Sequence, residues 1–221
     1  TRGVGDQCAP SYTLSQGTDY EGLAIRALLS KGWAVAVTDY EGLGTPGQHT
    51  YVVGQSEGRA MLDMARAAQR LPGTGLSSST PVGLMGYSQG GGAAGWAAQL
   101  APTYAPELNV KGVVAGGVPG DLTAVAEFQE GGLGVGLTLL ASIGLDTAYP
   151  ELDLESYLND TGRQLLEDAA DFCLVSVDGV GVLFSTAFDS RHDYVTTDPL
   201  AEPDWQARLA ENRLGAVAPQ V

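Results

Sequence analysis

Ser88 is the residue whose surroundings most clearly indicate chemistry. It lies in the stretch GYSQG, residues 86–90, which satisfies the G-x-S-x-G pattern of a nucleophilic serine on a sharp turn between a strand and a helix. An apolar run, PVGLM, precedes the pattern and an alanine-rich segment follows it, as such a turn requires. The pattern predicts a nucleophile at Ser88; the alternative is a serine in a structural turn of a chain that contains 31 glycines.

A nucleophilic serine needs a histidine that accepts its proton and an acid that orients this histidine. The chain contains two histidines. His49 precedes Ser88 in a loop rich in glycine and proline, where we expect it to make local hydrogen bonds. His192 follows Ser88 inside a helical region, and its neighbours Asp189 and Asp193 are expected to be solvated charges. We therefore expect neither histidine to be the base.

Stabilisation of an oxyanion beside Ser88 is easier to place. The helix that follows the serine would aim its backbone N–H groups and the positive end of its dipole at that position. The N–H group of Gln89 is the expected first donor. The second donor in such sheets comes from a loop after an earlier strand, which here corresponds to the opening residues 1–3.

Composition and charge limit the partners of this chemistry. The 221 residues include 11 Lys and Arg against 26 Asp and Glu, and the formal net charge of -15 repels nucleic acid and anionic lipid surfaces. No His or Cys spacing typical of a metal site occurs, and no phosphate-binding loop with a Lys is present, so we expect no metal and no cofactor. The longest weakly polar stretch, Gly131–Leu145, is shorter than the ~20 residues that span a bilayer, so we expect no membrane span.

The elements that must position Ser88 alternate between helix and strand in the first half of the chain. Apolar runs predict strands at 33–40, 81–87 and 109–118, and helical spacing predicts helices at 18–32, 56–71 and 90–101. The run WAVAVTDY, residues 33–40, is typical of a strand covered on both faces. Such alternation predicts an α/β fold with a parallel sheet and helices on its faces.

From Asp121 onward the pattern becomes helical. Helices are predicted at 122–130, 133–145, 152–160, 162–177 and 203–214, and the ending AVAPQV resembles a strand. We therefore divide the chain into a core portion at 1–120, a helical cap at 121–212, and the start of a returning core strand at 213–221. The run Leu133–Leu145 is our candidate for contacts with an acyl chain, with packing of the cap onto the sheet as the alternative.

Several longer stretches carry a more specific signal than any single motif. They are CAPSYTLSQGTDY, VTDYEG, SEGRAMLDMARA, GYSQGG, TYAPELNVKGVVAGGVP and DFCL. Their order and spacing resemble the secretory lipases of the Candida antarctica lipase A type, and the similarity covers essentially the whole chain. The resemblance implies part of an α/β-hydrolase sheet with an inserted helical cap.

The resemblance also implies roles for individual residues. Ser88 matches the family nucleophile, Gln89 matches the oxyanion donor, and the backbone N–H of Arg2 matches the second donor. Cys8 and Cys173, whose number alone does not distinguish a disulfide from two thiols, match half-cystines of the family. The family's acid and histidine follow the cap on later strands, so we expect both beyond Val221.

The function that this resemblance implies is that of a secreted serine ester hydrolase. It would cleave carboxylic esters such as triacylglycerols through an acyl-enzyme, act on lipid or other small ester substrates, and contact a lipid interface. One alternative is a non-catalytic lipid-binding module with the same fold. Another is an acyltransferase that uses the same acyl-enzyme. The sequence does not determine the oligomeric state.

Overall fold

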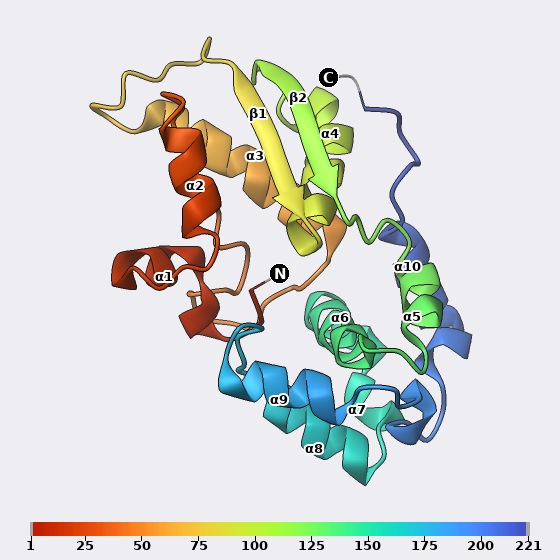
Figure 1. The fold of residues 1–221 in the computed structure, drawn as a ribbon. Coiled ribbons are helices and arrows are strands. Elements are labelled where there is room, and N and C mark those ends of the chain that lie inside the picture. Colours follow the sequence, from red (N-terminus) through yellow and green to blue (C-terminus); the bar gives the residue numbers. More distant parts are fainter. Residues whose placement is uncertain (1, 220–221) are drawn as a thin grey trace.

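A computed structural model describes residues 2–219, with the exception of the Asp178 side chain. Strands β1 (Val82–Tyr87) and β2 (Val110–Gly116) form a parallel pair, in register from Gly83 opposite Gly112 to Tyr87 opposite Gly116. Helices α3 (Gly54–Arg70) and α4 (Gln89–Tyr104) cover one face of this pair (Figure 1). The predicted order of helix and strand around Ser88 is confirmed, and the parallel strands with helices on one face agree with the predicted α/β architecture.

Two glycines allow α3 and α4 to approach closely. A Cβ atom on Gly54 would lie 1.9 Å from the indole nitrogen of Trp96, and one on Gly58 would lie 2.8 Å from the Trp96 Cβ. Leu62 of α3 and Leu84 of β1 are buried in the cluster that these elements share. This packing fixes α3 relative to α4, and therefore relative to Ser88 at the start of α4.

The opposite face of the sheet is exposed in the described part of the chain. Side chains alternate between the two faces of a strand, and Met85, Tyr87 and Val114 point away from α3 and α4; the exposed fraction of Tyr87 is 74%. The predicted strand at 33–40 is wrong, because this segment forms no ladder among residues 2–219, and its side chains are exposed or partly buried. An apolar run becomes a strand only when a neighbouring strand accepts its hydrogen bonds.

The N-terminal segment contains short helices. They are η1 (Asp6–Cys8), α1 (Pro10–Gln16) and α2 (Gly22–Leu29). Helix α2 was predicted from its apolar spacing, and Gly32, with φ of 79°, follows its end as expected. Its apolar side chains are not buried, since Leu23 and Leu29 are both exposed.

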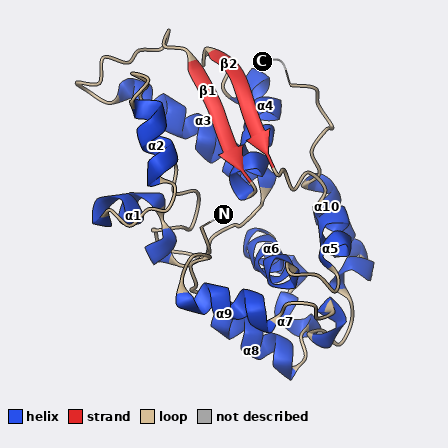
Figure 2. Ribbon diagram, viewed as in Figure 1, coloured by secondary structure: helices blue, strands red, loops and turns tan. Residues whose placement is uncertain are grey.

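Residues after β2 form helices connected by turns. Figure 2 shows no strand among them in the described chain, and the helices are α5 (Leu122–Gln129), α6 (Val135–Ala148), η2 (Pro150–Leu152), α7 (Leu154–Tyr157), α8 (Asp160–Ala169), α9 (Val177–Ser185), η3 (Arg191–Asp193), η4 (Pro199–Ala201) and α10 (Pro203–Glu211). The single helix predicted at 162–177 is wrong. The chain turns at Cys173, and Ser176 then accepts a hydrogen bond from the Gly179 N–H and caps a new helix.

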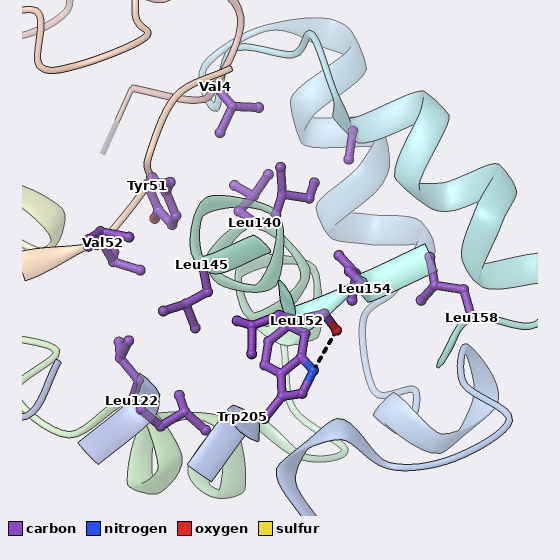
Figure 3. Packing of buried hydrophobic residues seen from close by; sticks show 14 of the residues in the cluster. Val4, Tyr51, Val52, Leu122, Leu140, Leu145, Leu152, Leu154, Leu158 and Trp205 are labelled. Carbon is purple, nitrogen blue, oxygen red and sulfur yellow. Dashed lines mark hydrogen bonds between the residues drawn. The ribbon is translucent and has the colours of Figure 1, made fainter. Parts of the chain in front are cut away.

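These helices share a hydrophobic core that is separate from the cluster under the sheet. Trp205 of α10 is 1% exposed, and its indole N–H donates to the Leu152 carbonyl at 3.2 Å (Figure 3). Leu140 and Leu145 of α6 lie in the same cluster, together with Val4 from the N-terminal segment. The predicted returning strand at 213–221 is wrong for residues 213–219, which have no strand pairing, whereas Gln220 and Val221 lie outside the described residues.

Candidate active site

Ser88 occupies the turn between β1 and α4. Its backbone has φ of 56° and ψ of -120°, an unusual conformation for a residue other than glycine, and such strain is often found at functional sites. The Ser88 N–H donates to the Gly116 carbonyl of β2 at 2.9 Å, and the Ser88 carbonyl accepts from the Gly92 N–H of α4 at 2.9 Å. The strand, turn and helix that the G-x-S-x-G pattern requires are therefore present.

Glycines on both sides of the serine permit this turn. A Cβ atom on Gly86 would lie 2.0 Å from the Gly90 carbonyl oxygen, and one on Gly91 would lie 2.2 Å from the Gly116 carbonyl oxygen. Apart from its chain neighbours and the backbone of its own helix, no atom lies within 4 Å of the place a Cβ would take on Gly90, the second glycine of the pattern. The close contact with β2 thus depends on Gly91, which the motif does not include.

The side chain of Gln89 is buried behind the turn. Its Nε2 atom donates to Nε2 of His49 at 2.8 Å and to Oε1 of Glu57 at 2.7 Å. The exposed fractions of these residues are 4% for Gln89, 0% for His49 and 1% for Glu57. Sequence reasoning selected Gln89, treated His49 as a loop histidine, and missed Glu57. The available signal was a carboxylate within the apolar repeat of the helix at 56–71.

His49 takes part in this buried contact as a neutral imidazole. Its Nδ1–H donates to the Glu41 carbonyl at 2.8 Å, which leaves Nε2 as the acceptor for Gln89. Burial lowers the pKa of His49 and outweighs the hydrogen bond to Glu41, which acts in the opposite direction. The expectation of purely local bonds is wrong, because Gln89 lies 40 residues away in sequence. The Nε2 lone pair of His49 is engaged by Gln89.

The second histidine lies among the helices after β2. His192 is exposed on η3, and its Nε2 lies 3.9 Å from Asp198 Oδ2. Of its neighbouring acids, Asp193 is exposed, as expected, and Asp189 is partly buried, and each accepts a hydrogen bond. Asp193 accepts from the Ser190 N–H at 2.9 Å in a capping box, and Asp189 accepts from the Tyr194 hydroxyl. The capping box at Asp193 satisfies a backbone N–H group of the short turn.

Arg2 lies in the segment expected to supply the second oxyanion donor, and Thr1 is outside the described residues. The Arg2 guanidinium pairs with Asp19 and, at 2.8 Å, with Glu21. Burial favours the neutral form of Asp19, but hydrogen bonds from Arg2 and Thr13 outweigh it and lower the pKa of Asp19. The Arg2 carbonyl accepts from the Leu174 N–H at 2.8 Å. The Arg2 side chain is therefore committed to structural pairs.

The two cysteines join this N-terminal segment to the later helices. Cys8 and Cys173 form a disulfide with a Cα–Cα distance of 5.3 Å. Gly3 pairs with Cys173 through an isolated β-bridge, and the Val4 N–H donates to the Phe172 carbonyl at 3.1 Å. The disulfide therefore holds the candidate oxyanion segment against the loop between α8 and α9.

The leucines proposed for acyl contacts have different surroundings. Leu140 and Leu145 are buried in the helical core, whereas Leu133 is 64% exposed. Leu140 and Leu145 therefore pack inside the helical core. A hollow of about 530 Å³ lies between α3, α6 and α10, and Ser88 does not line it.

Neither a cluster of metal-binding side chains nor a membrane-spanning helix is found in the described part of the chain. Among residues 2–219, no three His, Cys, Asp or Glu side chains are grouped so that they could hold a metal ion. None of the helices described combines the length and apolar character that crossing a bilayer requires.

Comparison with known proteins supports this geometry. The sequence model of the secretory lipase family matches residues 8–221. The chain belongs to the secretory lipase family. Family membership, together with the disulfide, confirms the expectation of a secreted protein.

The relatives of this secretory lipase family member include proteins named as lipases and one named as a probable inactive lipase. A probable inactive lipase of Mycobacterium tuberculosis is 35% identical over 98% of this chain and 49% of its own length. Lipase 4 of Candida albicans is 39% identical over 78% of this chain and 39% of its own length. The chain spans about half or less of the length of these curated relatives.

A solved structure has a fold similar to that of this secretory lipase family member. Candida antarctica lipase A in its closed state superposes with a TM-score of 0.83 and 30% sequence identity, over 99% of this chain and 53% of the other. The resemblance inferred from the quoted stretches is thereby confirmed.

Proposed function

We propose that the protein is a serine ester hydrolase that cleaves carboxylic esters such as triacylglycerols through an acyl-enzyme on Ser88. The observation that carries the proposal is the conformation of Ser88, a strained serine between a parallel strand and the start of α4. In this mechanism the Ser88 Oγ attacks the ester carbonyl, the alcohol leaves, and water then releases the acid. A secreted triacylglycerol lipase of Malassezia furfur, 33% identical over 78% of this chain, supports the substrate class.

Two backbone donors would stabilise the oxyanion in this mechanism. The Gln89 N–H, at the first position of α4, lies at the positive end of the helix dipole. The Arg2 N–H is the proposed second donor. We place the acid and the base beyond Val221, where the family resemblance puts them, because the Nε2 lone pair of His49 is engaged by Gln89 and His192 is an exposed residue of η3 among the helices after β2.

The helices at 121–212 act as a cap over this site in our proposal, and residues 1–120 form the core portion. Leu133 is exposed and remains a candidate for contact with an acyl chain or a lipid interface. The buried leucines of α6 support the cap from within.

A second candidate is a lipid-binding protein that keeps the fold without catalysis. The match to a probable inactive lipase over 98% of this chain favours this alternative. The two candidates differ in whether Ser88 reacts, because binding alone requires no nucleophile.

A phosphonate ester that labels serine nucleophiles tests the proposal. The protein, expressed with its natural flanking sequence, should be labelled once, and Ser88→Ala should abolish the label and the hydrolysis of a short-chain nitrophenyl ester. Ser79→Ala, in the loop before β1, is a matched control that should leave labelling unchanged. Equal labelling of the wild type and Ser88→Ala, or no labelling of either, would contradict a nucleophilic Ser88.

A further inference from the structure

A continuous set of hydrogen bonds lies directly behind the turn at Ser88. The side-chain amide of Gln89 uses both of its hydrogens, one toward His49 at 2.8 Å and one toward Glu57 at 2.7 Å. His49 is in turn held by the Glu41 carbonyl at 2.8 Å. We call His49, Glu57 and Gln89 the elbow triad. Each side chain has its orientation fixed by a partner from a different part of the chain.

The elbow triad also supports a second strained residue. Val52 has φ of 56°, which is a genuine outlier for a β-branched side chain. Its N–H donates to Glu57 Oε1 at 2.9 Å, the same oxygen that accepts from Gln89. One carboxyl oxygen thus joins Val52 to the residue that follows Ser88. Strained conformations persist only when their surroundings determine them strongly.

Burial makes these hydrogen bonds difficult to rearrange. The three side chains of the elbow triad are almost completely removed from solvent. A buried polar group that loses its partner cannot replace it with water, so an alternative rotamer of Gln89 would leave Nε2 of His49 without its donor and take one of the two hydrogen bonds from Glu57 Oε1. Glu57 itself lies on α3, which Gly54 and Gly58 hold tightly against Trp96 of α4.

We propose that the elbow triad positions the backbone of Gln89, so that its N–H keeps the direction needed to stabilise an oxyanion at Ser88. Glu57 and His49 are then positioning residues that act through Gln89 and do not touch the substrate. This inference rests on the proposed function, because it assumes that Ser88 forms a tetrahedral intermediate. It goes beyond the G-x-S-x-G pattern, which places no requirement on the side chain of the residue after the serine.

The test compares kcat, KM and the rate of phosphonate labelling in the protein with its natural flanking sequence. Gln89→Ala retains the backbone N–H and loses both side-chain bonds. We expect kcat and the labelling rate to fall about 10- to 100-fold with little change in KM, because a small misplacement of a reacting group is sufficient for such losses. Glu57→Ala should behave similarly, and Glu57→Gln should recover most of the activity, since its amide oxygen accepts the same two bonds.

A stability control separates positioning from general destabilisation. Leu108→Ala removes a buried side chain near the amino end of β2, away from Ser88, and should lower stability with kcat unchanged below the unfolding transition. If Gln89→Ala lowers only stability, as Leu108→Ala does, and labels Ser88 at the wild-type rate, the positioning role is overturned while the proposed function stands. A wild type that phosphonate does not label overturns both.

Discussion

Glu57 carries a carboxyl group that is completely enclosed by protein. Burial raises its pKa from an ordinary value of 4.5 to about 8, and hydrogen bonds from Gln89 and Val52 oppose this rise. The folded protein therefore retains a proton that the unfolded chain releases near pH 4.5. The stability that this retained proton contributes is fully present below pH 4.5 and is lost as the pH rises through about 8.

Substitution Glu57→Gln should remove this pH dependence while keeping the shape of the side chain. Relative to the variant, the wild type should lose up to about 1.4 kcal/mol of stability per pH unit between the two pKa values. Urea unfolding of both proteins from pH 5 to pH 9 measures the difference. His49 is present in both, so its own titration largely cancels. If the free energies of unfolding of the two proteins change in parallel from pH 5 to pH 9, Glu57 does not hold the proton.

At the scale of elements, Trp205 is the largest buried side chain that attaches helix α10. Trp205 is buried among the cap helices, contacts the Tyr157 ring edge-on with centroids 6.3 Å apart, and donates to the Leu152 carbonyl. Figure 3 shows the indole between Leu152 and the helices around it. The hydrogen bond and the apolar contacts together fix α10 against α6 and α7.

Truncation of this side chain should release α10. Trp205→Ala should lower the free energy of unfolding by about 3–5 kcal/mol, because it leaves a large cavity. Trp205→Phe fills most of that cavity but leaves the Leu152 carbonyl without its donor, so a smaller loss of about 1–3 kcal/mol is expected. Phe128→Ala on α5, where the side chain is 84% exposed, is the control and should change stability by less than about 0.5 kcal/mol. Equal effects of Trp205→Ala and Phe128→Ala would contradict this account.

At the scale of the whole molecule, the disulfide is the covalent connection between the N-terminal segment and the helices after β2. It joins residues 165 apart in sequence. Closing a loop of this size reduces the entropy of the unfolded chain, and the chain-entropy model gives a stabilisation of about 5 kcal/mol before native strain is subtracted. The same bond holds the Arg2 segment beside Leu174.

Removal of the disulfide should therefore affect both stability and the proposed oxyanion site. The double substitution Cys8→Ser and Cys173→Ser should lower the free energy of unfolding by about 3–5 kcal/mol. Guanidinium unfolding of the oxidised wild type, the reduced wild type and the double variant measures this loss. The reduced wild type and the double variant should have the same free energy of unfolding. A double variant as stable as the oxidised wild type would exclude the covalent link as a major source of stability.

The sequence by itself determined the order of helix and strand around Ser88, the strained turn at the serine, and the family. These follow from local information: apolar periodicity, the glycines beside the turn, and stretches of specific sequence. It also predicted helices for most of 121–212. It failed at 33–40 and 213–219, because strand formation depends on a partner strand and not on the apolar run alone.

Only the tertiary structure decided what lies behind the serine. Glu57 is an acid among the apolar positions of a helix, and His49 is a loop histidine; no spacing in the sequence connects either residue to Gln89. The close approach of α3 to α4 brings them together, and their burial turns ordinary polar side chains into a fixed hydrogen-bond network. Local pattern thus sets the position of Ser88 along the chain, whereas packing between distant segments sets the surroundings that orient it.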